Sequence, residues 1–232
     1  MTLLPILSAG AAKGLVTAIA PAFAVDTGAE VRGEFGAVGA IKERIKSGEA
    51  CDVIILTEAM IAGLEKDGEV VPGTAAPLGR VRTGIAVRAG DPVPAIGAAA
   101  ALSRALVAAT AIYLPDPQRA TAGIHFVDVL KRLGIHADVE PRLMAFPNGA
   151  TAMHELAQAP DAGSIGCTQI TEIRYTRGVT LVGPLPREFE LATVYAVAVS
   201  TRAGDPDRAL DFARRLAGLE TRMLRAQGGF ED

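Results

Sequence analysis

Short apolar segments alternate with helical stretches along the whole chain. Eight of them are rich in the aliphatic, β-branched and aromatic residues that buried strands favour. They read LLPIL, EVRGEF, CDVIIL, TGIAVR, AIYL, SIGCT, VTLVG and TVYAVAVS. Because this alternation places helices on the faces of a sheet, it predicts an α/β fold with mixed, mostly parallel sheets and flanking helices.

Helix-start and helix-stop residues support this prediction. Capping side chains, Pro at a helix start and Gly after a helix end mark the boundaries of helices. The predicted helices are 58–66 capped by Thr57, a helix capped by Thr121 that reaches Leu133, and one that starts at Asp205-Pro206 and ends before Gly228.

The composition narrows the class of protein. The chain has 232 residues, of which 50% are hydrophobic, and its formal net charge is −3. This length suits one large domain or two lobes of roughly 100 residues each. Without a Lys/Arg-rich run, nucleic-acid binding is not expected. No apolar stretch approaches the roughly 20 residues of a membrane span, so a soluble protein without membrane insertion is predicted.

Export and metal binding leave no sequence signal. Met1-Thr2 runs directly into the first predicted strand, without a basic segment and a cleavage site, which predicts a cytoplasmic chain. The alternative is a periplasmic protein from which an export signal has been removed. Cys51 and Cys167 lie far apart and outside any CxxC pattern, so both are expected to be buried free thiols. The three histidines show no metal-ligand spacing, and neither a metal nor a cofactor is predicted.

Three strand-to-helix turns consist mainly of small residues. They are Ser8-Ala9-Gly10, the stretch from Phe35 to Gly39, and Thr121-Ala122-Gly123. Such a turn presents unpaired backbone N–H groups and the positive end of a helix dipole, which together attract an anion. One such turn alone more often reflects tight packing, and none has the GxxxxGK[ST] or GxGxxG pattern of nucleotide-binding loops. Three of them in one chain suggest a shared anion pocket.

The order of these motifs carries a resemblance to a known family. The runs ILSAGAAKGL, GAVGAIKERIKSGEACDVIILTEAMIAGLEKDGEV, YLPDPQRATAGIHFVDVLKRLGI and AQGGFED are similar to the molybdate-binding-protein-like branch of the type II periplasmic binding proteins. The resemblance implies two lobes with a ligand cleft between them and closure about a hinge. It implies lobe I at 1–80 plus 193–232, lobe II at 84–190, and hinge strands near 79–83 and 191–195.

The chain departs from the family at hydroxyl-bearing positions. Molybdate binders resemble this chain but place serines where Ala11, Ala37, Val38 and Gly39 stand, and a tyrosine where Gln169 aligns. A buried oxyanion would lose several charge-assisted hydrogen bonds, each worth about 1.5–3 kcal/mol. The substitutions therefore predict a bulkier organic anion, a small di- or tricarboxylate, in place of molybdate.

Ligand contacts are expected from the three turns and from polar side chains near them. The candidates are Ser8, Ala9, Gly10, Ala11, Lys13, Ala37, Val38, Arg80, Thr121, Ala122, Gly123, His125, Asn148, Gly149 and Gln169. For Lys13 and Arg80, a solvated charge or an ion pair between lobes is an equal alternative. For His125, a half-buried helix histidine is the alternative interpretation.

Three functions stay open on these residues. The first is a monomeric solute-binding protein that delivers its anion to an ABC transporter permease. The second is an isomerase of small unsaturated carboxylates that resembles aconitate isomerase, with His125, Lys13 or Glu172 as the general base. The third is a cytosolic sensor that binds the same kind of ligand and signals to a protein partner. No GxSxG nucleophile motif is present.

Overall fold

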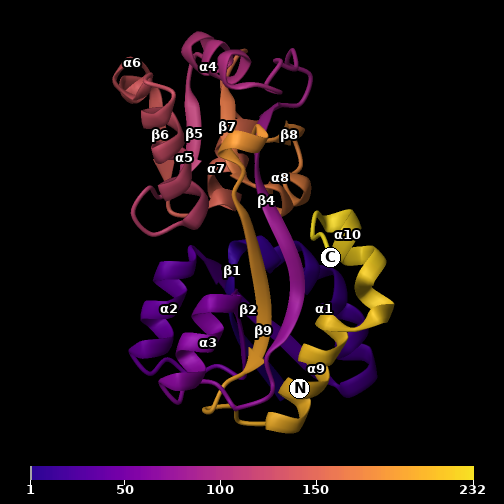
Figure 1. Ribbon diagram of the computed structural model, residues 1–232. Helices are drawn as coiled ribbons and strands as arrows, with labels where there is room; N and C mark the ends of the chain where they lie inside the picture. Colours follow the sequence, from indigo (N-terminus) through magenta and orange to yellow (C-terminus); the bar gives the residue numbers. More distant parts are fainter. Residues whose placement is uncertain (1) are drawn as a thin grey trace. The chain divides into compact units, whose positions relative to one another are not determined.

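The computed structural model describes residues 2–232 and divides the chain into two compact units. Unit 1 comprises the chain up to Val81 together with Thr193–Asp232, and unit 2 is Arg82–Ala192. Strands β4 (Ala76–Arg88) and β9 (Ala192–Val199) each contain a boundary, so the chain passes from one unit to the other twice, both times within a strand (Figure 1). Each unit has its own sheet and its own hydrophobic core.

Unit 1 is a mixed sheet with the strand order β2-β1-β3-β9. Strand β1 is parallel to β2 and β3, whereas β9 is antiparallel to β3. Its strands, besides β9, are β1 (Thr2–Ala9), β2 (Ala29–Gly36) and β3 (Val53–Thr57). Its helices are η1 (Gly10–Ala12), α1 (Lys13–Thr27), α2 (Val38–Lys46), α3 (Glu58–Lys66), α9 (Pro206–Ala217), η4 (Leu219–Thr221) and α10 (Arg222–Gly228).

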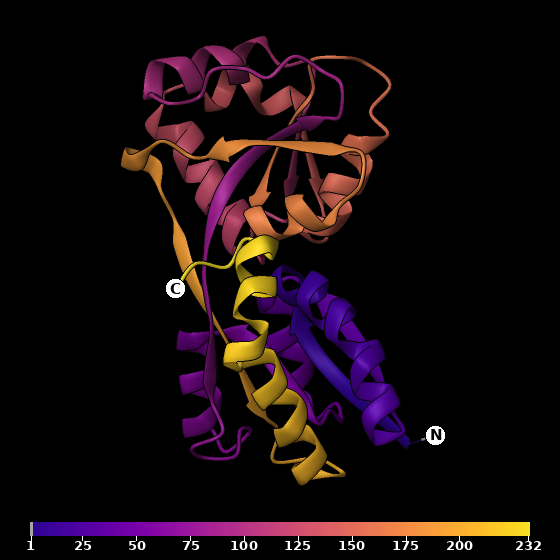
Figure 2. The same cartoon turned by 90° about the vertical axis from the view of Figure 1, so that its right-hand side faces the viewer.

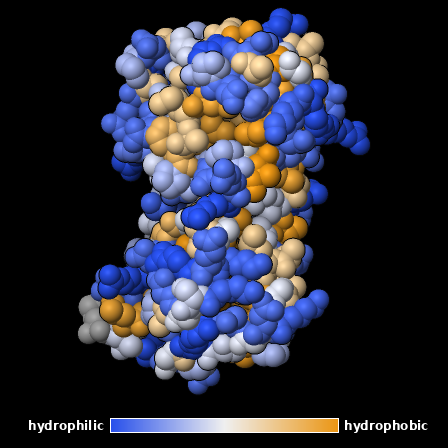
Figure 3. Space-filling view, turned by 90° about the vertical axis from the view of Figure 1, so that its left-hand side faces the viewer, coloured by the Kyte–Doolittle hydropathy of each residue, from blue (hydrophilic) through white to orange (hydrophobic). Residues whose placement is uncertain are grey.

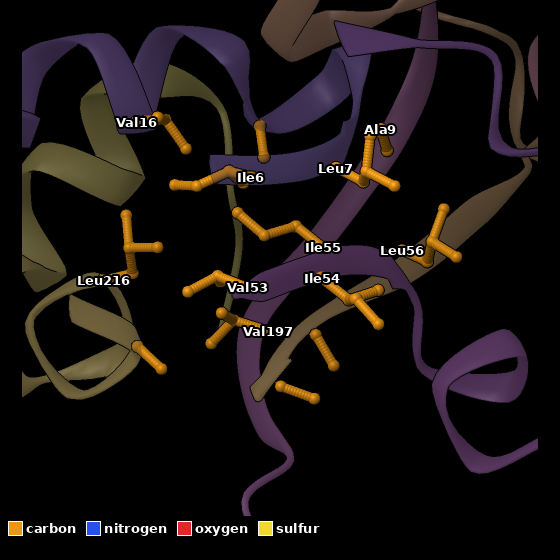
Figure 4. Close-up of a cluster of buried hydrophobic side chains, with 14 of the residues drawn as sticks. Ile6, Leu7, Ala9, Val16, Val53, Ile54, Ile55, Leu56, Val197 and Leu216 are labelled. Atoms are coloured by element: carbon orange, nitrogen blue, oxygen red, sulfur yellow. The ribbon is translucent and has the colours of Figure 1, made fainter. Parts of the chain in front are cut away.

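The core of unit 1 forms around β3. Residues 53–56 are completely buried, as expected for a central strand that is covered on both faces. Figure 4 shows side chains of β1, β3, β9, α1 and α9 converging there, among them Ile6, Val16 and Leu216. The rings of Phe23 and Phe212 pack edge to face at 4.8 Å, which holds α9 against α1, and both C-terminal helices contact α1 (Figure 2).

Unit 2 is a second mixed sheet, with the strand order β8-β4-β7-β5-β6. Strand β5 is parallel to β6 and β7, and β4 is antiparallel to β7 and β8. Its strands, besides β4, are β5 (Ile112–Pro115), β6 (Leu143–Phe146), β7 (Ile165–Gln169) and β8 (Val179–Pro184). Its helices are α4 (Ala99–Ala108), α5 (Thr121–Arg132), α6 (His136–Val139), η2 (Glu140–Arg142), α7 (Gly149–Ala157), α8 (Ile170–Tyr175) and η3 (Arg187–Phe189).

The two faces of the unit 2 sheet carry separate cores. On one face, Ile85 and Cys167 pack with Phe126 of α5. On the other, Ala86 and Tyr113 pack with residues of α7 and α8. This separation follows from the alternation of side chains along each strand, and it places α5 and α7 on opposite faces of the sheet.

The outer surface is largely polar. On the face shown in Figure 3, hydrophilic side chains predominate, with smaller hydrophobic areas between them. Within residues 2–232, each helix is too short or too polar to cross a lipid bilayer.

The predicted α/β fold with mixed sheets and flanking helices is confirmed, and all eight predicted strands are present. The helix predicted at 58–66 is confirmed as α3. Its predicted cap is confirmed as well, because Thr57 Oγ1 accepts a hydrogen bond from the amide of Met60 at 3.3 Å. Strand β6 was missed. It has only four residues and none of them is fully buried, so it gives a weak periodic signal.

Two helix boundaries were predicted wrongly. Thr121 does not cap α5: it is the first helical residue, and the cap position is Ala120. A turn organised by Asp116, whose carboxylate accepts from the amides of Gln118 and Arg119, sets the start of this helix. The C-terminal helix is interrupted at Gly218, where the backbone is extended.

Side-chain hydrogen bonds from Thr221 and Arg225 accompany this interruption. The buried guanidinium of Arg225 donates to the carbonyl oxygens of Leu216 and Gly218, at 2.9 and 2.8 Å. The hydroxyl of Thr221 also lies within hydrogen-bonding distance of both oxygens, so the carbonyls that follow the end of α9 are satisfied by side chains of η4 and α10. The last helix ends at Gly228, one residue later than predicted, and its C-cap is Gly229, which has a left-handed φ of 103°.

Candidate functional site

Helices η1–α1, α2 and α5 begin without a side-chain cap. Their cap residues are Ala9, Ala12, Ala37 and Ala120, none of which can accept a hydrogen bond through its side chain. By contrast, α3, α7 and α9 are capped by the side chains of Thr57, Asn148 and Asp205. Each small-residue turn is followed by a helix without a side-chain cap, so the N-terminal donors there are not used by a side chain of the turn. Helices α4, α6, α8 and α10 also lack such a cap.

Two of these helix starts lie next to each other in unit 1. Strands β1 and β2 are parallel neighbours, and Ala9 at the end of β1 pairs with Gly36 at the end of β2. Because η1 and α2 begin directly after these residues, their N-termini share one edge of the sheet. The residues there are small and buried: Ala9, Gly10, Ala11, Ala37 and Val38. This edge can supply backbone donors from two helices to one anion.

Ser8 and Lys13 are the polar side chains at this edge. Ser8 is fully buried at the end of β1, and its hydroxyl donates to the carbonyl oxygen of Ala9 at 2.9 Å. Lys13 is the first residue of α1, and its ammonium lies 5.9 Å from the centre of the Phe35 ring, one residue before the end of β2. A half-buried cation therefore lies beside the two helix N-termini.

Arg80 belongs to a different part of unit 1. Its backbone exchanges two hydrogen bonds of 2.7 Å with Glu231, and its guanidinium lies 3.6 Å from the carboxylate of that residue. The Arg80 side chain is half exposed. This local ion pair with the C-terminal segment gives Arg80 a role in attaching the chain end to β4.

In unit 2, α5 starts close to the end of β5. A Cβ atom on Gly123 would lie 2.2 Å from the carbonyl oxygen of Pro115 and 2.5 Å from that of Asp116. Gly123 therefore permits the helix to approach the strand end, with Thr121 and Ala122 in the same first turn. His125 follows in this helix, and its Nε2 lies 2.7 Å from the carbonyl oxygen of Phe189, which orients the ring toward η3.

The N-terminus of α7 binds a carboxylate of the protein, that of Glu172. Asn148 Oδ1 accepts from the amide of Thr151 at 2.9 Å, and the Glu172 carboxylate accepts from the amides of Gly149 and Ala150. A Cβ on Gly149 would lie 2.0 Å from Glu172 Oε2, so glycine is required for this contact. The backbone amide of Gly149, which was predicted to contact a ligand, is thus used within unit 2, and the amide oxygen of Asn148 is used to cap α7.

Glu172 itself is completely buried among these donors. Its Oε2 also accepts from the hydroxyl of Thr168 at 2.5 Å. Burial raises the pKa of the Glu172 carboxyl from the ordinary 4.5 to about 6, while the hydrogen bonds from Thr168 and three backbone amides lower it and only partly compensate. The carboxyl is ionised at neutral pH and joins α7 to α8.

Three polar side chains of unit 2 are buried without a hydrogen-bond partner within residues 2–232. They are the hydroxyls of Thr83 and Thr171 and both amide atoms of Gln169. Gln169 was a predicted site residue, but Thr83 and Thr171 were missed. The sequence signal for Thr83 was only a threonine directly before the apolar run of β4, and its pairing with the end of β7 is seen in the structure alone.

Neither cysteine is a reactive thiol, and the described residues show no metal-binding cluster. Cys51 and Cys167 are buried and free, as predicted. Burial raises the pKa of the Cys51 thiol to about 11 and that of Cys167 well above its ordinary value, so both stay protonated. The part of the chain that the structure describes contains no cluster of three or more His, Cys, Asp or Glu side chains suited to a metal ion.

The sequence matches the family of bacterial extracellular solute-binding proteins over residues 4–231. The chain belongs to this family. Among solved structures, this solute-binding protein is similar to the periplasmic molybdate-binding protein of Azotobacter vinelandii, with a TM-score of 0.80 and 18% identity over 99% of each chain. It is also similar to the sulfate-binding protein SubI of Mycobacterium tuberculosis, with a TM-score of 0.75 and 20% identity over 99% of this chain and 86% of that one.

One relative in sequence is named as an enzyme and not as a binding protein. An aconitate isomerase from a Pseudomonas species is 26% identical to this solute-binding protein over 229 residues, which are 95% of this chain and 84% of that protein. The structural similarities show a periplasmic-binding-protein fold that is also found in proteins named for inorganic oxyanions. The relative found by sequence is named as an isomerase of an organic acid.

Proposed function

We propose that this solute-binding protein captures a small organic di- or tricarboxylate. The observation that carries the proposal is the edge of unit 1 where the uncapped N-termini of η1 and α2 lie beside Lys13. Backbone N–H groups and a lysine ammonium are suited to carboxylate oxygens. In unit 2, the uncapped start of α5 offers a further set of donors of the same kind.

The turns of unit 1 favour an organic anion over a tetrahedral oxyanion. Residues 9–12 and 37–40 contain no hydroxyl, and the Ser8 hydroxyl is bonded to the neighbouring backbone. A desolvated molybdate or sulfate would leave several of its acceptor oxygens without donors at this edge, at a cost of about 1–3 kcal/mol for each. A carboxylate has only two oxygens to satisfy at each binding point.

We expect calorimetry to show this selectivity directly. Citrate, tricarballylate, malate and succinate are titrated alongside molybdate, tungstate and sulfate. At least one carboxylate should bind tenfold or more tightly than any of the oxyanions. The oxyanions should bind no more tightly than a Kd of about 10 μM, or about −7 kcal/mol. Nanomolar binding of molybdate would contradict the proposal. Native mass spectrometry of the purified protein would identify a carboxylate that co-purifies.

A lysine variant locates the binding edge. Lys13→Gln removes the ammonium beside η1 and α2 while keeping a long polar side chain, and it should weaken carboxylate binding about tenfold. Lys66→Gln, at the exposed end of α3, is the matched control and should bind as the unchanged protein does. Equal affinities of the two variants would place the carboxylate away from this edge.

The proposed partner is the permease of an ABC-type importer, and this role requires a periplasmic or extracellular location. Membership in the solute-binding family supports both proposals. Fractionation of cells that produce the protein from its own gene tests the location. Recovery solely from the cytosol would favour the sensor function.

A second candidate function is isomerisation of a small unsaturated carboxylate, which the aconitate isomerase relative favours. The reaction needs a base that removes a carbon-bound proton and an acid that returns one. The Glu172 carboxylate is held by four donors inside unit 2, and His125 Nε2 lies against the carbonyl oxygen of Phe189. Lys13 is the candidate that lies at the proposed carboxylate-binding edge. Lys13 is therefore the base to test.

Incubation with cis-aconitate in deuterated water distinguishes catalysis from binding alone. An isomerase should produce the trans isomer with deuterium incorporated, and Lys13→Gln should abolish both. Under the binding-protein proposal, cis-aconitate remains unchanged over hours, and proton NMR would show neither isomerisation nor exchange.

A further inference from the structure

Gln169 and Thr83 form a pair of buried polar groups with unused hydrogen-bonding capacity. Gln169 is 3% exposed and Thr83 is 0% exposed. Within residues 2–232, neither the amide nitrogen nor the amide oxygen of Gln169 has a hydrogen-bond partner, and the same holds for the Thr83 hydroxyl. Because both amide atoms are unpaired, the observation does not depend on which way the amide is oriented. Buried polar groups in native proteins are normally paired, so these three atoms point to a missing ligand.

The strand register brings the two side chains together. Thr83 of β4 is directly opposite Gln169 of the antiparallel strand β7. The amide of Thr83 donates to Leu191 and its carbonyl accepts from Leu185, so both backbone groups point away from β7. The two residues are therefore a non-hydrogen-bonded pair, in which the side chains share one face of the sheet and are closest.

This pair lies on the face and at the edge where α5 begins. Ile85 and Cys167, two residues away on the same strands, pack with Phe126 of α5. Side chains two residues apart in a strand share a face, so Thr83 and Gln169 are on the α5 side. Strands β5 and β7 are parallel, and α5 follows the carboxyl end of β5 while Gln169 is the last residue of β7. The uncapped start of α5 therefore lies at the same edge as the Gln169–Thr83 pair.

The chemistry of the pair selects a group that both donates and accepts. A fully ionised carboxylate or an inorganic oxyanion has only acceptors, so it would leave the Gln169 amide oxygen unpaired. An alcohol hydroxyl can donate to this oxygen and accept from the Gln169 amide or from Thr83. We propose that Gln169 and Thr83 form a subsite for a hydroxyl group, and that the preferred ligands are hydroxy di- or tricarboxylates. This inference rests on the proposed carboxylate-binding function.

Matched ligands that differ by one hydroxyl test the subsite. Citrate is compared with tricarballylate and malate with succinate, by calorimetry at constant pH and salt. The unchanged protein should bind the hydroxylated member of at least one pair tenfold or more tightly. In Thr83→Val and Gln169→Met, which remove the polar groups at nearly constant side-chain volume, this preference should fall below threefold. The affinity for the deoxy ligand should be retained, because it has no hydroxyl to bind these two side chains.

A threonine elsewhere in unit 2 provides the control. Thr180→Val makes the same chemical change at an exposed position of β8 and should keep the full preference for the hydroxylated ligand. Thr83→Val is nearly isosteric and removes an unpaired hydroxyl, so it should also melt no earlier than the unchanged protein. The Thr83→Val variant therefore keeps the test decisive even if Gln169→Met folds poorly.

The outcomes separate this inference from the proposed function. Equal binding of both members of each pair by the unchanged protein would overturn the hydroxyl subsite and leave carboxylate binding standing. Retention of the preference in Thr83→Val and Gln169→Met would also overturn it. Failure of all four carboxylates to bind would overturn both proposals.

Discussion

Gly123→Ala should lower the free energy of unfolding by about 2 kcal/mol. The new Cβ would lie 2.2 Å from the carbonyl oxygen of Pro115 and 2.5 Å from that of Asp116. Both oxygens belong to the backbone at the end of β5, so they cannot rotate away as a flexible side chain could. Overpacking of this kind costs typically about 1–3 kcal/mol and outweighs the 0.5–1 kcal/mol or so that alanine gains over glycine in a helix. Urea-induced unfolding measures the loss.

A second helix glycine gives the matched control. In Gly63→Ala, in the interior of α3, the added Cβ meets no atom within 4 Å. This variant should be as stable as the unchanged protein or more stable by about 0.5–1 kcal/mol. If the two variants have the same stability change, α5 does not approach the end of β5 as closely as the structure shows. That result would also remove the structural explanation for a glycine in the third small-residue turn.

Glu172→Ala should have a larger effect, about 3 kcal/mol. The carboxylate accepts from the Thr168 hydroxyl and from the amides of Gly149, Ala150 and Gln169. Removal of this acceptor leaves up to four buried donors unpaired, each at a cost of about 1–3 kcal/mol before water enters the space. Thermal and urea unfolding should both show the loss, and hydrogen exchange should speed up in the first turn of α7.

Glu172→Gln keeps an acceptor and isolates the effect of pH. The folded-state pKa of Glu172, about 6, lies above its ordinary value of 4.5, so the folded protein binds this proton more tightly than the unfolded chain. The stabilisation by the proton is complete below pH 4.5 and is lost as the pH rises through 6. A difference of about 1.5 pKa units corresponds to about 2 kcal/mol.

The measurement compares the two proteins across pH. Between pH 7.5 and 4.5, the unfolding free energy of the unchanged protein should rise by up to about 2 kcal/mol relative to that of Glu172→Gln. The comparison cancels the contributions of other titrating groups, because these are common to both proteins. Parallel profiles, or a relative decrease toward low pH, would contradict the raised pKa.

Local features of the fold could be predicted because their causes are local. The strands appear as short apolar runs, and α3 is defined by a threonine cap and the glycine that follows it. The small-residue turns at Ala9 and Ala37 also lead into helices without side-chain caps, as their composition indicates. In each case, the residues responsible lie within a few positions of the feature that they determine.

The errors have causes that are distant in sequence or too short to detect. Strand β6 has four residues and depends on its pairing with β5, which lies about thirty positions earlier. The interruption at Gly218 is stabilised by the Arg225 guanidinium, a contact that no helix-stop signal contains. Tertiary hydrogen bonds therefore overrode a correct local helix preference.

The sequence by itself determined the α/β class, the starts of α3 and α9 and the presence of three turns suited to anions, because backbone propensity and capping act over a few residues. Only the tertiary structure decided which polar groups are available to a ligand. It used the amides of Gly149 and Ala150 for Glu172, more than twenty positions away. It placed Thr83 opposite Gln169, and within residues 2–232 neither side chain has a hydrogen-bond partner. Strand register and helix packing join positions far apart in the chain, and these long-range contacts decide which donors and acceptors remain unused.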